Sequence, residues 1–452
     1  MNLFLASDQR PVHFVGIGGA GMAALALVAL RRGVAVSGSD TDTSGCGDLR
    51  AAGATVREGI HPEMVDQARA VVASAAIPAG HAELQRAAEL GVPVVPRKGA
   101  LAELIAGART VAIAGTHGKT TTTVMTAEAL EAAGFNPTAL AGGRVGSWGG
   151  NARIGGTECF VVEADEYDQA FLALYPTVAV INNVEPDHLE CYGSVEAMEA
   201  AFVEFAGRAE SILIGNDGVG SDRVAAMLGP RVSRFGPGAA GVGLALRVAN
   251  PGGAEGEVSW PDGRTVTLRL QVPGLHNLRN ATGALAAVAA LGGDVVRAAE
   301  ALAAFTGVGR RFERLGEHAG VEWVDDYAHH PTEVAATLAA AREAYPGRRL
   351  VAVFQPHLYS RTALHGVALG HALVAADLAV VTGIYPAREA PIPGVTGAVV
   401  AQAALAAGGA VEYLEERDQL ANAVRPLLRA GDVVLTLGAG DITRLATELG
   451  VR

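Results

Sequence analysis

A glycine-rich segment with a single lysine carries the strongest chemical signal in the sequence. AGTHGKTTTT, residues 114–123, lies between an apolar run typical of a strand and a run with helical periodicity. Ile113 stands where the first glycine of the phosphate-loop pattern GxxxxGK(S/T) would be, so the loop is shortened. In the shortened loop, we still expect backbone N–H groups and a solvent-facing Lys119 ammonium to bind phosphate oxygens. The Thr120 hydroxyl is expected to bind a magnesium ion. The expected loop contacts are Gly115, Thr116, His117, Gly118, Lys119, Thr120 and Thr121.

Acidic side chains follow two expected strands further along the chain. One group belongs to VVEADEYD and the other to VEPDHLECYG. Because the carboxyl ends of parallel strands meet at one edge of a sheet, the two groups should lie close together. Carboxylates and a histidine beside a phosphate loop are natural ligands for Mg²⁺ on a nucleotide, whereas a solvated acidic loop is the alternative for any one of them. The residues are Glu163, Asp165, Glu166, Asp168, Glu185, Asp187 and His188.

A second glycine loop lies near the N-terminus. GIGGAG, residues 16–21, follows the run VHFV and opens the helical run AGMAALALVALRR. Glycines at such a turn let the backbone approach a phosphate at the helix N-terminus. Asp40, at the end of the next expected strand, is placed to bind a ribose hydroxyl. A tight turn without a ligand is the alternative.

Polar clusters in the second half of the chain follow other expected strands. Asn277 and Asn280 share one helix face, where helix capping and a nucleotide-base contact are equally open. The adjacent His329 and His330 could hold a metal, although neighbours on a short loop point apart. The remaining members are Arg310 and Arg311, which can clamp phosphate, and Asp325, Asp326, Tyr327, His357, Arg361, Tyr385 and Arg388.

Length, composition and charge limit the class of protein. The chain has 452 residues, enough for about three domains of roughly 150 residues. Half of the residues are hydrophobic and 18% are charged, which indicates a large buried core. A net charge of −12 without a run of Lys or Arg argues against nucleic acid as a partner. Three cysteines at unrelated spacings predict neither a metal site nor a disulfide framework.

The N-terminus and the apolar runs predict a cytoplasmic protein without a membrane partner. MNLFLASDQR lacks the basic and apolar regions of a signal peptide. The apolar run AGMAALALVAL ends at Arg31 and is shorter than the ~20 residues that a spanning helix needs. We expect a monomer or a weak homodimer.

Short β-rich runs alternate with helical runs from Val12 onward. This alternation predicts parallel sheets with right-handed crossovers. The run 235–270 breaks the pattern, and WPDGRTVTLRL predicts a β-hairpin with its turn at Asp262–Gly263. We therefore expect an α/β fold of three domains, at residues 1–108, 109–308 and 309–452. The expected strands are 12–15, 34–40, 70–74, 92–95, 110–115, 159–163, 178–183, 211–215, 323–327, 350–354, 378–383, 411–414 and 432–438.

Taken together, the motifs resemble the Mur ligase family. GIGGAGMAALA, AGTHGKTTTT, EADEYD, NVEPDHLECYG, GLHNLRNA, GRRFE, DDYAHHPTE, FQPHLYSRT and YPAREAPIPG occur in this order along nearly the whole chain. The phosphate loop and EAD are common to the superfamily, which includes folylpolyglutamate synthase, whereas GIGGAGM, DDYAHHP and YPARE are typical of the member that adds alanine. The resemblance implies a Rossmann-like N-terminal domain for a UDP-sugar, a central ATPase domain with the hairpin, and a C-terminal Rossmann-like domain for the amino acid.

The resemblance also implies an activity. An ATP-dependent ligase of this kind joins L-alanine to the lactyl carboxylate of UDP-N-acetylmuramate, a step of peptidoglycan precursor synthesis. The carboxylate attacks the γ-phosphate of ATP to give an acyl phosphate and ADP, and the amine of alanine then displaces phosphate. The implied cofactor is Mg²⁺, or Mn²⁺ in its place.

Site residues follow from the same resemblance. Catalytic roles are implied for Lys119, Glu163, His188, His329 and Arg361, and metal binding for Thr120, Glu163 and His188. The implied UDP-sugar contacts are Gly16, Gly18, Gly19, Ala20, Gly21, Met22, Ser39, Asp40 and Ser74. The implied ATP contacts beyond the phosphate loop are Asn277, Asn280, Arg311 and Asp326, and the implied amino-acid contacts are Tyr327, His329, His357 and Arg361.

Three positions depart from the family pattern, and three other functions compete. Leu358, Gly383 and His81 replace residues that are common in the family, but none has an expected catalytic role. The rival within the family is the recycling ligase that attaches a tripeptide to the same sugar, whose glycine loop resembles GICGTFM. An NAD-dependent oxidoreductase would use GIGGAG but leave the phosphate loop without a role. A regulatory nucleotide switch would bind ATP without ligation.

The lysine content bears on the second metal site. Several family members that add later residues hold a second Mg²⁺ with the help of a carbamylated lysine, located after the loop that contains the DH pair. Lys98 and Lys119 are the only lysines of this chain, so no lysine follows the phosphate loop. Arginine is a poor candidate for carbamylation because of its very high pKa. We therefore expect His188, helped by Glu163, to hold the second cation without a carbamate, and Lys98 to be solvated.

Overall fold

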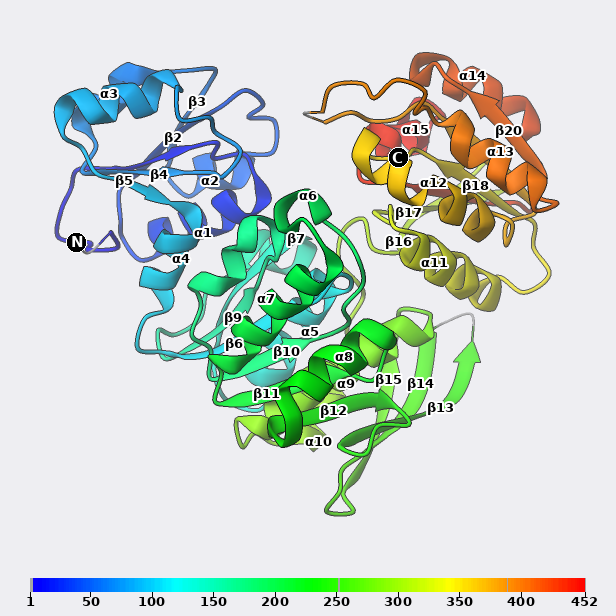
Figure 1. Cartoon of the computed structure of the whole chain (residues 1–452), viewed down its shortest axis with the longest axis horizontal. Helices are drawn as coiled ribbons and strands as arrows, with labels where there is room; N and C mark the ends of the chain where they lie inside the picture. The colour runs from blue at the N-terminus through cyan, green and yellow to red at the C-terminus, as the bar shows by residue number, and fades with distance from the viewer. Residues whose placement is uncertain (1–2, 251–252, 388, 452) are drawn as a thin grey trace. The chain divides into compact units, whose positions relative to one another are not determined.

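Three largely parallel sheets, each covered by helices, make up the protein in the computed structural model, which describes residues 3–250, 253–387 and 389–451 (Figure 1). The expected α/β fold class is confirmed. The chain divides into two compact units. The N-terminal unit comprises Met1–Ala245, Val258–Val266 and Arg279–Leu302, and the C-terminal unit comprises Leu246–Glu257, Thr267–Leu278 and Ala303–Arg452.

The first sheet carries the glycine loop. Its five strands have the order β3-β2-β1-β4-β5, and every pair is parallel. The direction of strand succession reverses between β1 and β4, and in open α/β sheets such a reversal places a ligand crevice at the carboxyl ends of the strands. The glycine loop leaves β1 at this point. The elements are β1 (Val12–Val15), α1 (Ala20–Arg31), β2 (Val36–Asp40), α2 (Gly47–Ala51), β3 (Thr55–Glu58), β4 (Ala70–Ala73), α3 (Ala82–Leu90), β5 (Val94–Pro96) and α4 (Arg97–Ile105).

The second sheet carries the phosphate loop. Its ten strands have the order β15-β14-β13-β12-β11-β10-β6-β9-β7-β8, and the phosphate loop leaves β6 between its parallel neighbours β10 and β9. The expected hairpin turn is present: the Trp260 N–H donates to the Arg264 carbonyl at 3.0 Å, and Gly263 has a φ of +87°. The strands are β6 (Arg109–Ala114), β7 (Thr138–Val145), β8 (Gly150–Arg153), β9 (Cys159–Glu163), β10 (Val178–Ile181), β11 (Ser211–Gly215), β12 (Val232–Pro237), β13 (Val242–Asn250), β14 (Gly253–Ser259) and β15 (Thr265–Leu270). The helices are α5 (Lys119–Ala132), α6 (Leu189–Tyr192), α7 (Val195–Gly207), α8 (Val219–Leu228), α9 (Leu275–Ala290) and α10 (Val295–Leu302).

The third sheet belongs to the C-terminal unit. It has the order β16-β17-β21-β18-β19-β20, in which only the β16–β17 pair is antiparallel. The parallel strands therefore end together at one edge, where the loops after β17, β18 and β19 meet. The elements are β16 (Glu313–His318), β17 (Val321–Asp326), α11 (Pro331–Ala344), β18 (Leu350–Phe354), α12 (Tyr359–Leu373), β19 (Leu378–Thr382), α13 (Ala398–Ala406), β20 (Val411–Leu414), α14 (Leu420–Val424), β21 (Val433–Leu437) and α15 (Arg444–Glu448).

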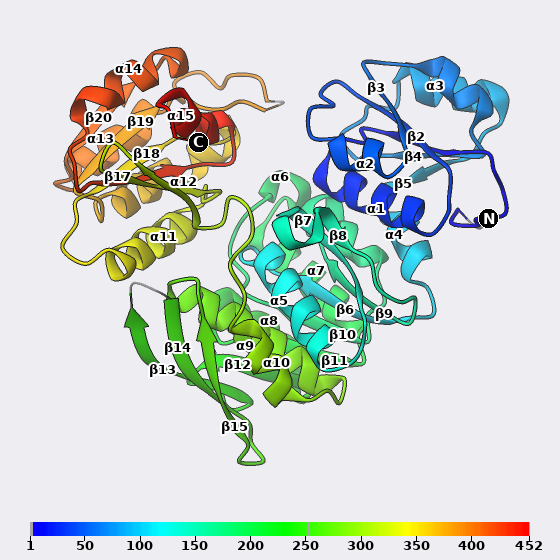
Figure 2. The ribbon, with the colours of Figure 1, turned by 180° about the vertical axis from the view of Figure 1, so that it is seen from behind.

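Helix α1 joins the first two sheets into one unit. It packs against β7 and β8 of the second sheet as well as against its own sheet (Figure 2). All residues of α1 from Ala24 to Ala29 are buried, as expected for a helix covered on both sides. The shared apolar core includes Leu27 and Val28 of α1 and Leu140 and Ala152 of the two strands.

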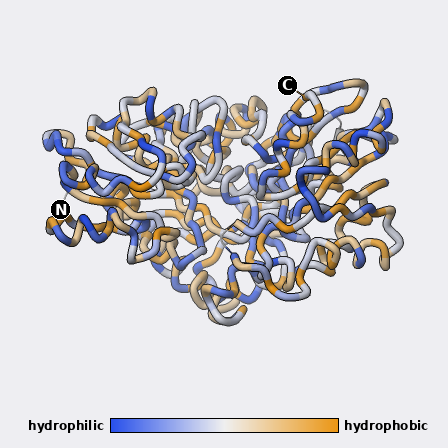
Figure 3. The backbone as a smooth tube through the Cα atoms, turned by 90° about the horizontal axis from the view of Figure 1, so that it is seen from above, coloured by the Kyte–Doolittle hydropathy of each residue, from blue (hydrophilic) through white to orange (hydrophobic). Residues whose placement is uncertain are grey.

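Apolar segments alternate with polar connections along the whole chain (Figure 3). None of the helices in the described ranges is long and apolar enough to cross a membrane. The strands that sequence analysis did not anticipate are mostly edge strands or contain glycine. β3 and β16 are largely exposed and polar, so they lack the apolar run by which a buried strand is recognised.

Candidate active site

The phosphate loop closes around the ammonium of Lys119. Gly118 begins α5 with a φ of 76°, a left-handed conformation that favours glycine. Lys119 Nζ donates to the Gly115 carbonyl at 2.7 Å, the Thr116 carbonyl at 3.2 Å and Glu166 Oε1 at 2.8 Å. The lysine side chain is only 15% exposed, so the expectation that it faces solvent is wrong. Burial alone would lower the pKa of Lys119, but the carboxylate of Glu166 and its acidic neighbours outweigh burial and raise it.

Two expected metal ligands face each other beside this loop. Thr120 Oγ1 donates to Glu163 Oε1 at 3.2 Å, and Glu163 Oε2 accepts from the Gly142 N–H of β7 at 2.6 Å. A Cβ at Gly142 would lie 2.6 Å from Glu163 Oε2, so the absence of a side chain lets the carboxylate lie against the strand. A hydroxyl and a carboxylate are the hard oxygen donors that Mg²⁺ prefers.

Two asparagines that sequence analysis placed at the end of a strand hold the loop in shape. Asn183 Oδ1 accepts from the His117 N–H at 2.8 Å, and Asn182 Nδ2 donates to the His117 carbonyl at 3.1 Å. Both asparagines are buried. They follow β10, which pairs with β6, and the signal that could have found them is a polar pair at the carboxyl end of a buried strand.

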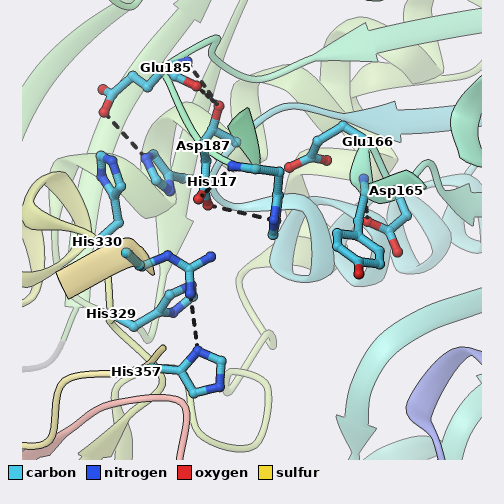
Figure 4. A network of polar contacts seen from close by, with 12 residues as sticks. His117, Asp165, Glu166, Glu185, Asp187, His329, His330 and His357 are labelled. Carbon is cyan, nitrogen blue, oxygen red and sulfur yellow. Dashed lines mark hydrogen bonds and ion pairs between the residues drawn. The ribbon is translucent and has the colours of Figure 1, made fainter. Parts of the chain in front are cut away.

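The residues after β10 bring further polar groups to the same edge (Figure 4). His117 Nε2 lies 3.4 Å from Glu185 Oε2. His188 has a left-handed φ of 53° and lies between Asp187 Oδ2 at 3.7 Å and Glu190 Oε1 at 3.4 Å. Glu185 therefore contacts the phosphate loop, and the His188 ring, 5.2 Å from that of Tyr167, lies against the segment after β9; the negative charge of these carboxylates suits cations.

The glycine loop after β1 is fixed by the next strand. The N–H groups of Gly16 and Ile17 donate to the Ser39 carbonyl at 2.9 and 3.1 Å, and the Gly18 N–H donates to Asp40 Oδ2 at 2.8 Å. Asp40, the expected ribose contact, thus holds the loop through one carboxylate oxygen. Ser39 and Asp40 lie where the sequence predicted, at the carboxyl end of β2.

The other expected UDP-sugar residues line the start of α1 and the end of β4. Gly19 caps α1, which begins at Ala20 and has neither a side-chain cap nor an acidic residue in its first turn. The helix N-terminus therefore retains N–H groups that suit an anion. A Cβ at Gly16 would lie 3.2 Å from the Cβ of Ser74, so the two loops are in contact. Met22 is 2% exposed because its side chain is buried in the core, so only its backbone could contact a ligand.

Two basic residues at the start of α4 pair with the acidic segment after β9. Arg97 Nη2 lies 3.1 Å from Asp165 Oδ2, and a Cβ at Gly21 would lie 2.8 Å from Arg97 Nη1. Lys98 Nζ lies 3.2 Å from Asp168 Oδ2, and its side chain is 38% exposed. Sequence analysis missed Arg97, which touches both the glycine loop and the segment that holds Glu163.

Asn277 and Asn280, for which helix capping and a base contact were equally open, have separate surroundings. A Cβ at Gly118 would lie 2.5 Å from Asn280 Oδ1, so Asn280 borders the phosphate loop. Asn277 Nδ2 instead donates to the Pro273 carbonyl at 2.8 Å, a local bond at the start of α9. The Asn277 side chain thus donates to the turn before α9, which is neither an N-cap nor a base contact, while Asn280 adjoins the phosphate loop.

Asp326 is buried at the end of β17 in the C-terminal unit. Its Oδ2 accepts from the Phe312 N–H at 2.7 Å and its Oδ1 from the Ala328 N–H at 2.8 Å. Burial raises the pKa of Asp326 to about 6, and Arg311 opposes that shift. The carboxylate expected to meet ATP thus also ties residues 312 and 328 to the strand.

Tyr327 lies against two arginines. The guanidinium carbons of Arg310 and Arg311 are each 5.0 Å from the centroid of its ring. Arg310 is further held by Asp325 Oδ2 at 3.2 Å, and Arg311 Nη1 lies 3.7 Å from Glu333 Oε1. The ring expected to contact an amino acid therefore also supports the arginine expected to contact phosphate.

The expected amino-acid residues gather where β17, β18 and β19 end (Figure 4). The rings of His329 and His357 are 5.9 Å apart, and His357 stacks on Tyr385 at 5.9 Å. Arg361 Nη1 lies 3.0 Å from His357 Nδ1. His329, His357 and Tyr385 come from three different loops and Arg361 from the start of α12, so the sheet edge brings them together. Arg388 lies outside the described residues.

The adjacent histidines do not act as a pair. His329 Nδ1 lies 2.9 Å from the Tyr327 carbonyl, whereas His330 caps α11 by accepting from the Thr332 N–H. Their different partners support the alternative that neighbouring residues on a short loop point apart.

The three departures from the family pattern have local structural roles. Leu358 precedes α12 with a φ of 68°. A Cβ at Gly383 would lie 2.4 Å from the Glu415 carbonyl oxygen, so a side chain there would collide with backbone. His81 caps α3, and its Nδ1 is buried without a hydrogen-bond partner among the described residues.

Comparisons with known proteins agree along the whole chain. Three family models match in succession: "Mur ligase family, catalytic domain" over residues 11–109, "Mur ligase middle domain" over 113–288 and "Mur ligase, glutamate ligase domain" over 310–440. A UDP-N-acetylmuramate–L-alanine ligase from Streptomyces avermitilis is 45% identical over 450 residues, which cover 98% of this chain and 97% of the relative. The crystal structure of a UDP-N-acetylmuramate–alanine ligase from Thermotoga maritima superimposes with a TM-score of 0.84 at 29% identity, covering 97% of this chain and 98% of that one. A murein peptide ligase from Psychrobacter arcticus gives a TM-score of 0.72 at 27% identity, covering 97% of each chain.

Proposed function

The chain belongs to the Mur ligase family, and we propose that it joins L-alanine to the lactyl carboxylate of UDP-N-acetylmuramate with ATP, giving ADP and phosphate. The observation that carries the proposal is a phosphate loop whose lysine adjoins a Thr120–Glu163 oxygen pair, on a chain 45% identical along nearly its full length to a ligase of that name. An oxidoreductase would leave this loop without a role.

The residues beside the loop fit magnesium. Thr120 and Glu163 offer oxygens 3.2 Å apart, and His188 lies among carboxylates at the same edge. We assign these three residues as the metal ligands. Magnesium bound there would neutralise the charge that develops on the phosphate oxygens during transfer.

The first step forms the acyl phosphate. We expect the backbone N–H groups of the loop and the Lys119 ammonium to hold the phosphates of ATP, with Asn280 beside Gly118 at the loop's edge. The lactyl carboxylate attacks the γ-phosphorus, the bond to the β-phosphate oxygen breaks, and ADP leaves. Lys119 assists because its charge meets the negative charge of the transferring group in a site with little water.

The second step forms the amide. We expect His329, His357 and Arg361 to orient alanine, and Arg361 to face its carboxylate as a fixed cation. The uncharged amine attacks the acyl carbon, a tetrahedral intermediate forms, and phosphate leaves. Arg311 is our candidate for contacting phosphate, and Asp326 for contacting the ATP ribose.

The second cation requires no carbamate in this proposal. Lys98 is paired with Asp168, which leaves it without a role at Thr120 and Glu163. We propose that His188, with Glu163 and substrate oxygens, holds that cation.

Phosphate release from ATP tests the function. The assay contains UDP-N-acetylmuramate and, in turn, L-alanine, glycine, L-serine and the tripeptide that the recycling ligase uses. We expect release that depends on both the sugar and L-alanine. Release with the tripeptide but not with L-alanine would assign the recycling activity, for which the likeness to the murein peptide ligase is the supporting observation. Phosphate release that requires neither the sugar nor an amino acid or peptide would contradict a ligase activity.

A further inference from the structure

Glu166 is a buried carboxylate that the mechanism above does not use. The residue is 2% exposed, and its Oε1 accepts the hydrogen bond from Lys119 Nζ at 2.8 Å. Its Oε2 is buried and has no hydrogen-bond partner among the described residues. Among the described residues, Lys119 is the cation that hydrogen-bonds to this side chain, and His188 adds a smaller electrostatic attraction.

Two hydrogen bonds and a sharp turn hold the backbone around Glu166. The Glu166 carbonyl accepts from the Tyr192 hydroxyl at 2.5 Å and from the Gln169 N–H at 3.0 Å. Asp168 and Gln169 have left-handed φ values of 52° and 51°, which turn the chain sharply just after Glu166. Glu166 thus faces the phosphate loop from a hydrogen-bonded turn.

The ammonium of Lys119 must release one of its three acceptors before it can donate to a phosphate. Release of Glu166 would leave a buried carboxylate without its hydrogen-bonded cation, which is among the costliest changes in a protein interior. Release of the Thr116 carbonyl would free a neutral acceptor whose bond, at 3.2 Å, is also the longest of the three. The Thr116 bond is therefore the one that gives way.

We propose that Glu166 is a positioning residue that stays paired with Lys119 while ATP is bound and directs the freed hydrogen of the ammonium at the phosphate. This inference rests on the proposed function, because it takes ATP as the ligand of the loop. Glu166 acts through Lys119 and contacts no substrate itself. Its contribution should thus appear in turnover, where the direction of the lysine matters, more than in nucleotide binding.

The test compares Glu166→Gln with Glu158→Gln, which makes the same change at an exposed position just before β9, at the amino end of that strand. For Glu166→Gln we expect kcat to fall on the order of 10- to 100-fold, as for a misaligned electrostatic group. The KM for ATP and the affinity for ADP by calorimetry should change much less. Glu166→Asp should recover part of the loss, and Glu158→Gln should remain close to the wild type. A lower KM for ATP in Glu166→Gln would overturn the proposal, because Glu166 would then compete with phosphate for the lysine. An unchanged kcat with a lower melting temperature would also overturn it, since the role would be structural.

A second readout needs no activity. Lys119→Met should lower the melting temperature by leaving Glu166 unpaired, and Lys119→Met combined with Glu166→Gln should recover much of that loss. Additive losses would show that the pair is not coupled and would refute the proposal. If the wild type released no phosphate with any acceptor, the proposed function would fail while this stability cycle could still succeed, so the two failures are distinguishable.

Discussion

Gly142→Ala should impair metal binding while leaving the fold intact. A Cβ at Gly142 would lie 2.6 Å from Glu163 Oε2, whereas ordinary contacts begin at 3.4 Å, so the carboxylate has to move by about 0.8 Å. The atoms in the way are the end of a flexible side chain, and Gly142 has no positive φ that alanine would strain. Glu163 will therefore give way while the backbone stays in place, losing its position beside Thr120.

The size of the effect follows from that displacement. A misplacement of about 1 Å in a site of this kind lowers turnover on the order of 100-fold, or roughly 2.7 kcal/mol. The magnesium concentration at half-maximal rate should rise as well, because Glu163 is an assigned ligand. The free energy of unfolding should change by less than about 1 kcal/mol, which is usual for a glycine-to-alanine change at a compatible site.

Phosphate release at several magnesium concentrations, together with thermal unfolding, checks this prediction. Gly146→Ala is the matched control, because it makes the same change near the end of the same strand and its Cβ would meet nothing within 4 Å. If Gly142→Ala and Gly146→Ala show the same turnover and magnesium dependence, Glu163 does not hold the metal in the way that we infer.

Four further outcomes are expected. Lys119→Met should lose ligation by several kcal/mol of transition-state stabilisation while still folding, and near-normal phosphate release would disprove the phosphate-loop assignment. Asp40→Ala should weaken the binding of UDP-N-acetylmuramate and leave the affinity for ATP almost unchanged, as measured by calorimetry with each ligand alone. Loss of ATP binding would mean that we have assigned the two nucleotide sites the wrong way round. Lys98→Arg should keep nearly full activity without added bicarbonate, whereas His188→Ala should raise the magnesium requirement; dependence of the wild type on bicarbonate would refute this. Burial raises the pKa of Asp326 from 3.8 to about 6, so the folded protein keeps a proton that the unfolded chain loses between those pH values. The free energy of unfolding should therefore fall by about 3 kcal/mol as the pH rises from about 4 to 6, and change no further through this group above pH 6. Denaturant titrations of Asp326→Asn should lack this fall.

The local pattern of the sequence was sufficient for the parts of the site that lie within one loop. The phosphate loop, the glycine loop and the acidic strand ends were all recognisable, since each consists of consecutive residues after an apolar run. Asp40 and His188 could likewise be placed at strand ends because the carboxyl ends of parallel strands share one edge.

The tertiary structure alone decided which of these groups touch. Lys119 meets Glu166 across 47 residues, and Gly142 meets Glu163 across 21, because the strand order β10-β6-β9-β7 places β9 between β6 and β7. The separation of Asn277 from Asn280 likewise depends on what packs against each side chain. Strand order and packing arise from contacts between distant residues, and no pattern of neighbouring residue types encodes which distant partner will be chosen.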